Sequence, residues 1–225
     1  MKIVFLDKVD STNDYIKRYI DGREDVAVAA KEQTNGRGTK GRSFSSAVGG
    51  LYVTVLRFYD RLFAKDAYRI VADTAVAVVK TLSAFGLDAK IKWPNDIFCS
   101  GKKICGISTE NSLIGDRVDH SMTGIGVNIY NEIPSDLKDI AISAQQILGR
   151  NLDINAVLFT LLYNLEQKQE AGLYARYSCV LGKKITVLKR SGEVFDAVAK
   201  DITEDGRLVL DNGEALTSAE IKIKL

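Results

Sequence analysis

The chain has 225 residues, and its 31 Lys and Arg residues against 29 Asp and Glu residues give a formal net charge of +2. This length allows one substantial domain with a small appendage, and the small net charge argues against a general nucleic-acid-binding protein. No apolar run approaches the roughly 18 residues of a membrane helix, and the N-terminus does not read as a secretory signal peptide. Three cysteines without metal-ligand spacing lead us to expect reduced thiols, a cytoplasmic location and no membrane partner.

The first 178 residues mix strand and helix patterns. Strand patterns occur at residues 2–6, 25–33, 50–59, 89–93, 103–110 and 119–130. Helix patterns begin after Ser11 or Thr12, which favour N-caps, and recur at 62–85, 143–149 and 154–174. Turns are expected at 94–96 and 113–116. The lone histidine, His120, lies in the polar stretch GDRVDHS and is expected at the surface.

After Ser178 the pattern changes to short strands. Ser-Gly, Glu-Asp-Gly and Asp-Asn-Gly sequences separate these strands and supply turn chemistry. Regular spacing of this kind predicts a small β-barrel. We therefore expect two domains, residues 1–178 and 179–225.

Residues 34–44 read TNGRGTKGRSF, with three glycines among three cationic side chains. Glycine lets backbone N–H groups approach a bound anion, and arginine and lysine neutralise its charge. The stretch therefore predicts an anionic ligand. Taken alone, a mobile surface loop with solvated charges explains it equally well.

Five polar stretches lie at expected strand ends and loops. They are STN (11–13), QTNGRGTKGR (33–42), KWPND (92–96), KKICGI (102–107) and GIGVN (124–128). Each also has a structural explanation: a helix cap, a solvated loop, a turn over a buried indole, a basic strand start and a strand ending in a turn asparagine.

Together and in this order, the five stretches resemble the signature series of the biotin–protein ligases, and the C-terminal segment resembles the SH3-like end domain of that family. The resemblance implies an α+β fold, with a mixed β-sheet flanked by helices as in class II aminoacyl-tRNA synthetases, and a small C-terminal SH3-like β-barrel. It implies that biotin attacks the α-phosphate of ATP, with Mg²⁺, to give biotinyl-5'-AMP and pyrophosphate. A lysine of a biotin carboxyl carrier protein domain then receives the biotin.

The resemblance also implies three overlapping sets of site residues. The catalytic set is Lys103, which bridges carboxylate and phosphate, with Arg37 and Asp96. Asp96 is further expected to orient the acceptor lysine and to hold the metal. The biotin set is Ser11, Thr12, Asn13, Gln33, Arg37, Gly38, Thr39, Lys103 and Gly106. The ATP set is Arg37, Lys40, Arg42, Lys92, Trp93, Asn95, Lys103 and Asn128, in which Trp93 is expected to brace the wall rather than touch substrate.

Three residues depart from the family pattern. Thr39 replaces the second loop arginine, which predicts weaker retention of the adenylate unless Lys40 compensates. Phe44 replaces a tryptophan and keeps a stacking surface without its N–H donor. Cys105 is interpreted as a small apolar wall residue, because no histidine base lies nearby in sequence.

Two other functions fit parts of the sequence. A lipoate or octanoyl transferase would share the catalytic fold, although its motif series differs. An RNA-binding module would use the basic loop and the barrel, but Phe195 is the only aromatic residue of the barrel segment. Ser11 lies ten residues from the start, so we expect no N-terminal DNA-binding domain, no DNA partner and no repressor activity. The resemblance leaves a homodimer open.

Overall fold

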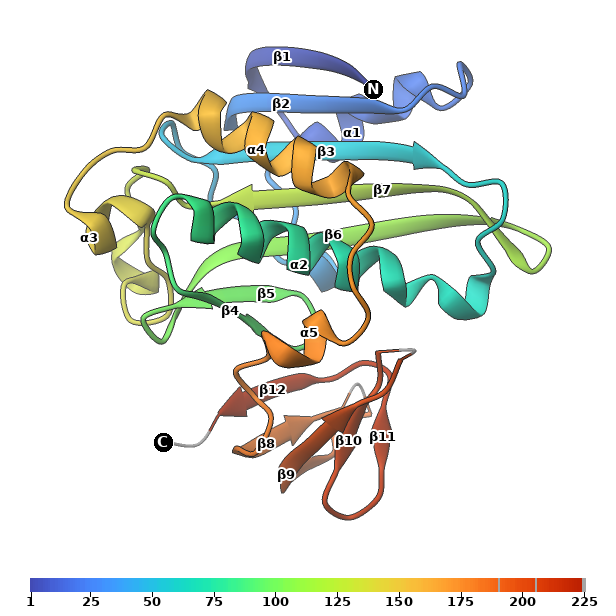
Figure 1. The fold of residues 1–225 in the computed structure, drawn as a ribbon. Helices are drawn as coiled ribbons and strands as arrows, with labels where there is room; N and C mark the ends of the chain where they lie inside the picture. The colour runs from blue at the N-terminus through green and yellow to red at the C-terminus, as the bar shows by residue number, and fades with distance from the viewer. Residues whose placement is uncertain (190, 205, 224–225) are drawn as a thin grey trace.

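The computed structural model describes residues 1–189, 191–204 and 206–223, and of Lys40 it describes the backbone alone. Within these residues, seven strands form one sheet in the order β1-β2-β3-β7-β6-β5-β4 (Figure 1). The strands are β1 (Lys2–Val9), β2 (Val26–Gln33), β3 (Leu51–Phe58), β4 (Ala89–Lys92), β5 (Asp96–Cys99), β6 (Lys102–Ile114) and β7 (Arg117–Val127). β1 and β2 are parallel and the other pairs are antiparallel. The predicted mixed sheet is therefore confirmed.

Helices cover both faces of this sheet. α2 (Tyr68–Ala84) and α4 (Ile154–Glu166) pack against each other over one face, and the short α1 (Thr12–Ile16) contacts β2, β3 and β7 on the other (Figure 1). The remaining helical segments are α3 (Ala144–Leu148), α5 (Leu173–Arg176) and 3-10 turns at Lys17–Tyr19, Thr39–Gly41, Ala64–Asp66 and Ser135–Leu137. No helix among the described residues is long and apolar enough to cross a membrane.

The side chains of β2 alternate between two hydrophobic clusters. Ala27 and Ala29 belong to the large core beneath α2 and α4, whereas Val26 and Val28 join a smaller cluster with Ile16 of α1. β7 alternates in the same way, with Ile125 and Val127 in the large core. The residues between and beside them on its other face are glycines, so the α1 face of β7 lacks side chains at these positions.

Two boundaries differ from the sequence expectation near the edge strands. The expected turn at 94–96 is followed at once by β5, a short strand that the sequence did not predict. α2 begins at Tyr68 rather than at Leu62, because the preceding segment pairs with the β6–β7 turn. Val118 N donates to Leu62 O at 2.8 Å, and Ala64 N donates to Asp116 O at 2.8 Å.

The single helix expected over 154–174 is two helices, α4 and α5. α4 ends where side chains bind the carbonyls of its last turn. Arg57 donates to Leu165 O at 3.2 Å, and Gln169 donates to Asn164 O at 2.8 Å. The C-cap residue Gln167 is extended. These partners satisfy carbonyls that would otherwise bond the next helical turn.

The C-terminal residues form a second, antiparallel sheet in the order β11-β10-β9-β8-β12. Its strands are β8 (Lys184–Leu188), β9 (Val194–Ile202), β10 (Leu208–Leu210), β11 (Ala215–Leu216) and β12 (Glu220–Ile223). β11 and β12 lie at opposite edges, so among the described residues the sheet does not close into the expected barrel. It packs below β4 and α5 in Figure 1, and Trp93 Nε1 donates to Gly206 O at 2.9 Å across this contact.

The expectation for His120 was wrong, because the residue is 7% exposed. Its Nδ1 lies 2.7 Å from Asp119 Oδ2, and its ring packs against Phe58. Cys99, Cys105 and Cys179 are free thiols, as expected.

Candidate active site

The glycine-bearing face of β7 contributes to a cavity of about 50 Å³. Its walls come from α1, the end of β2, the loop 34–44 and the start of β6. All nine residues of the predicted biotin set line it: Ser11, Thr12, Asn13, Gln33, Arg37, Gly38, Thr39, Lys103 and Gly106. Stretches that are distant in sequence therefore converge at one place.

The polar end of the cavity is held by a hydrogen-bond network. Gln33 Oε1 accepts from Thr12 N at 2.8 Å and from Thr12 Oγ1 at 2.9 Å, and Gln33 Nε2 donates to Ser46 at 2.8 Å. Thr54 Oγ1 donates to Asn13 Oδ1 at 2.5 Å. Ser11 occupies the N-cap position of α1 but makes no side-chain cap bond. Its buried hydroxyl is therefore available to a ligand.

The glycine-rich loop is folded back beside the cavity. Gly38 N donates to Arg42 O at 2.7 Å, and Phe44 N donates to Gly36 O at 2.8 Å. Arg37 forms an ion pair with Asp14 of α1 at 2.8 Å. Arg42 does not line the cavity and pairs with Glu220 of β12, so the two arginines tie the loop to α1 and to the second sheet.

Lys103 and Asp96 form the charged pair of the site. Lys103 Nζ lies 2.6 Å from Asp96 Oδ1, and the two side chains are 33% and 29% exposed. Their closeness follows from strand register, because Asp96 of β5 pairs with Gly106 of β6. A Cβ at Gly106 would lie 3.1 Å from the Lys103 ammonium. The glycine therefore gives the lysine room beside the cavity.

Phe44 covers the glycine surface. A Cβ at Gly126 would lie 2.5 Å from the Phe44 ring, and one at Gly106 would lie 3.2 Å from it. Tyr52 packs edge-on against this ring with centroids 6.3 Å apart. The stacking surface expected of Phe44 therefore rests on bare backbone.

The residues of the predicted ATP set are spread more widely. Asn95 lines the cavity, and its Nδ2 donates to Ile107 O at 2.5 Å. Trp93 is 1% exposed in the core, and Lys92 lies over the ring of Phe98. Both amide ends of Asn128 are bonded, one to Ile142 O and the other to Asn131. The cavity lining does not include Lys92, Trp93, Asn128 or Arg42. The side chain of Lys40 lies outside the described residues.

Asp96 is the residue for which a metal role was predicted. Among the residues that the structure describes, no group of three or more His, Cys, Asp or Glu side chains could hold a metal ion. A single carboxylate suits Mg²⁺ that arrives on nucleotide phosphates, because this ion keeps most of its ligands as water and phosphate oxygen. Asp96 is thus a single carboxylate that would suit a nucleotide-borne Mg²⁺.

Several lining residues were missed by sequence reasoning. They are Tyr52, Ile107, Ser108, Gly124, Ile125 and Gly126. The two glycines were visible in the GIGVN stretch, but only Asn128 was selected there. Cys105 is fully buried and burial raises its pKa, as its interpretation as a wall residue requires.

Comparison with known proteins assigns the chain to a family. The profile of the biotin/lipoate A/B protein ligase family matches residues 5–128, and that of the biotin protein ligase C-terminal domain matches residues 180–223. The chain belongs to the biotin/lipoate A/B protein ligase family. The first match spans more than half of the chain and contains every residue of the predicted biotin set.

Relatives and solved structures of this family resemble nearly the whole chain. The bifunctional ligase/repressor BirA of Bacillus subtilis is 32% identical over 218 residues, which cover 89% of this chain and 66% of the relative, slightly less than two thirds. A biotin--[acetyl-CoA-carboxylase] ligase of Mycobacterium tuberculosis is 27% identical, covering 86% and 75%. The biotin protein ligase of Aquifex aeolicus, solved with biotin and ATP, superposes with a TM-score of 0.81 at 26% identity, covering 99% and 98%.

Proposed function

We propose that the chain is a biotin–protein ligase that forms biotinyl-5'-AMP from biotin and ATP and then transfers biotin to a lysine of a biotin carboxyl carrier protein domain. The observation that carries this proposal is the convergence of Ser11, Thr12, Asn13, Gln33 and Lys103 on one cavity. Polar groups at one end suit the ureido ring of biotin. The cationic group at the other end suits its carboxylate and the α-phosphate.

Lys103 is proposed to bring the two reacting anions together. One opposing charge at about 4 Å offsets roughly 4 kcal/mol at an effective dielectric near 20. A preorganised cation at the α-phosphate is therefore a large contribution to catalysis. Asp96 holds the Lys103 ammonium at 2.6 Å, which keeps it beside the cavity.

Arg37 and Asp96 have proposed roles on either side of Lys103. Arg37 would leave Asp14 and turn toward the phosphates as the loop closes. Asp96, once Lys103 contacts substrate, would orient the acceptor lysine and take its proton. Mg²⁺ on the nucleotide would neutralise phosphate charge, and Asp96 is the carboxylate that would contact it.

The direct test is pyrophosphate release with ATP, Mg²⁺ and either biotin or lipoate. We expect pyrophosphate release with biotin but not with lipoate. We expect a labelled carrier-domain lysine only when that domain is added. Release with lipoate in place of biotin would identify the chain as a lipoate ligase. If neither acid supports release, the chain does not activate a carboxylate in this way.

Further proposals concern organisation. We place the domain boundary between residues 178 and 179, with an SH3-like unit after it. The backbone on either side of Ser178 still pairs with β4, since Ile91 N donates to Tyr177 O and Cys179 N to Ile91 O. We also propose a cytoplasmic ligase. A homodimer through the edge strand β1, where Phe5 is 55% exposed, is a further proposal that sedimentation would test.

A further inference from the structure

A second and larger cavity lies on the opposite face of the same two strands. Its volume is about 450 Å³, which is in the range of ligand pockets. Val55 of β3 and Ile125 of β7 form its floor with Ile70 of α2. The first half of α2 and residues 165–169 after α4 form its sides. Neither the sequence motifs nor the proposed reaction uses this cavity.

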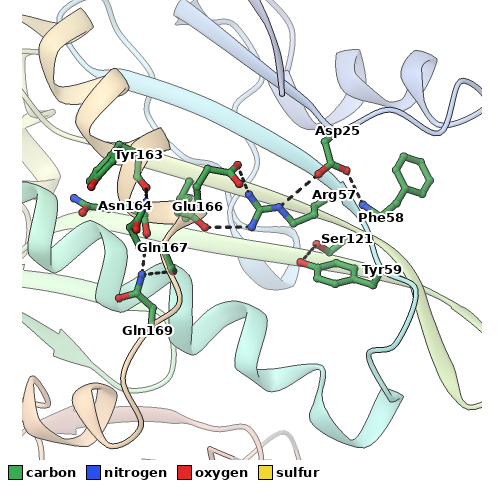
Figure 2. A network of polar contacts seen from close by, with 11 residues as sticks. Asp25, Arg57, Phe58, Tyr59, Ser121, Tyr163, Asn164, Glu166, Gln167 and Gln169 are labelled. Atoms are coloured by element: carbon green, nitrogen blue, oxygen red, sulfur yellow. Dashed lines mark hydrogen bonds and ion pairs between the residues drawn. The ribbon is translucent and has the colours of Figure 1, made fainter.

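A polar network fixes one side of the cavity (Figure 2). Arg57 donates to Glu166 Oε1 at 2.7 Å and lies 3.8 Å from Asp25, so its charge is already matched. Tyr59 OH lies 3.2 Å from Ser121 Oγ. Figure 2 shows Arg57 reaching from β3 between the carboxylates of Asp25 and Glu166. These groups hold the wall in place and leave few of their own polar atoms for a ligand.

The charges left for a ligand have both signs. Asp73 of α2 lines the cavity, and no hydrogen bond to its carboxylate is seen within the described chain. Partial desolvation beside the cavity raises the pKa of Asp73, although its side chain is exposed, and the charge of Arg69 only partly opposes this. Arg69 and Lys168 are exposed cations at the same mouth. Asp73 is itself exposed at the mouth, so its carboxylate is open to a ligand, and a bound ammonium group would stabilise its charged form.

We propose that this cavity binds a small zwitterion with an apolar body, of which an α-amino acid with an apolar side chain is the simplest case. Its ammonium group would contact Asp73, and its carboxylate would contact Arg69 and Lys168. Its side chain would lie on Val55 and Ile125. A simple amine or a simple carboxylic acid satisfies only one of these charges, so both should bind more weakly.

The experiment compares three probes with the same phenyl group on the full chain: L-phenylalanine, 2-phenylethylamine and 3-phenylpropionate. Calorimetry is expected to give saturable, one-to-one binding of L-phenylalanine that excess biotin does not displace. The amine and the acid should each bind about tenfold more weakly or worse, the equivalent of about 1.4 kcal/mol per lost ion contact. Asp73→Asn should weaken L-phenylalanine to the level of the acid.

Asp88→Asn is the matched control, because Asp88 is an exposed carboxylate that pairs with Lys90 away from the cavity. It should bind L-phenylalanine like the parent. Thermal unfolding verifies that both variants are folded. Arg69→Gln removes a proposed contact to the ligand carboxylate and should independently weaken L-phenylalanine binding. The proposal is overturned if no binding is seen at about 10 mM L-phenylalanine, a Kd that corresponds to a binding free energy of about 3 kcal/mol. Equal binding of the amine or the acid, displacement by biotin, or an unchanged affinity in both Asp73→Asn and Arg69→Gln also overturns it.

Discussion

The two faces of the β3–β7 strand pair differ in the size of their side chains and in the cavities beside them. On the α1 face, Thr54 pairs with Gly124, and the bare backbone makes room for a small, polar cavity. On the α2 face, Val55 pairs with Thr123 beside a cavity about nine times larger. The proposed reaction is placed at the smaller cavity, because the cationic side chains that it needs lie there. The cavity is small because the ring of Phe44 and these side chains fill the space around it. Cavity size alone would have pointed to the α2 face.

The largest predicted effect concerns the charge on the α1 face. Lys103→Ala removes the cation expected at the α-phosphate, and loss of one preorganised group of this kind lowers a rate by about 10²–10³. We expect pyrophosphate release with biotin and ATP to fall by about this factor. Lys102→Ala is the control, since its ammonium binds Lys138 O at the surface. Equal rates for the parent and Lys103→Ala would refute the assignment.

The second prediction tests the bare backbone of the same face. A Cβ at Gly124 would lie 2.6 Å from Asn13 Oδ1, the atom that Thr54 holds. Gly124→Ala should therefore displace Asn13 and weaken biotin binding about tenfold, or about 1.4 kcal/mol. Gly22→Ala is the control, because its Cβ would meet only Tyr19 O at 3.6 Å. Calorimetric titration with biotin measures both variants, and an unchanged affinity in Gly124→Ala would contradict the geometry.

Much of the α1 face was expected because its residues lie in the motif stretches that carry the family resemblance. The structure adds that Ser11 to Asn13 follow β1 and Gln33 ends β2, and that the parallel pairing of these strands brings them together. The missed lining residues depend on register instead. Tyr52 contacts Phe44 because it pairs with Gly126 of β7 and the Phe44 ring lies over that glycine, and nothing in the sequence near Tyr52 indicates this contact.

The α2 face was not predictable from local patterns. The end of α4 is set by Arg57 and Gln169, which bind carbonyls of its last turn from outside the helix. The helix pattern over 154–174 could not reveal these partners. Similarly, Asn128 reads as a ligand residue from its motif, yet both of its amide ends bind protein groups.

The third prediction concerns the stability of the α2 face. Arg57→Ala removes a charged hydrogen bond to Glu166 and another to Leu165 O. Such bonds contribute about 1.5–3 kcal/mol, and because Arg57 is a quarter exposed we expect about 1.5 kcal/mol less unfolding free energy. Urea unfolding measures this, with exposed Arg61→Ala as the control. Biotin activation per folded molecule should not change, and its loss in folded Arg57→Ala would show that the two faces act as one site.

The smallest predicted effect returns to the loop at the α1 cavity. Thr39 lines the cavity where the family pattern has an arginine, so the rim has one cation fewer to hold the adenylate. Thr39→Arg should slow release of biotinyl-5'-AMP, measured without acceptor protein, by about two- to fivefold, since an exposed charge contact contributes about 0.2–1 kcal/mol. Thr39→Gln separates charge from length and should release the adenylate at the parental rate. An equal slowing in Thr39→Gln would attribute retention to side-chain size, and no slowing in Thr39→Arg would mean that other loop cations already hold the intermediate.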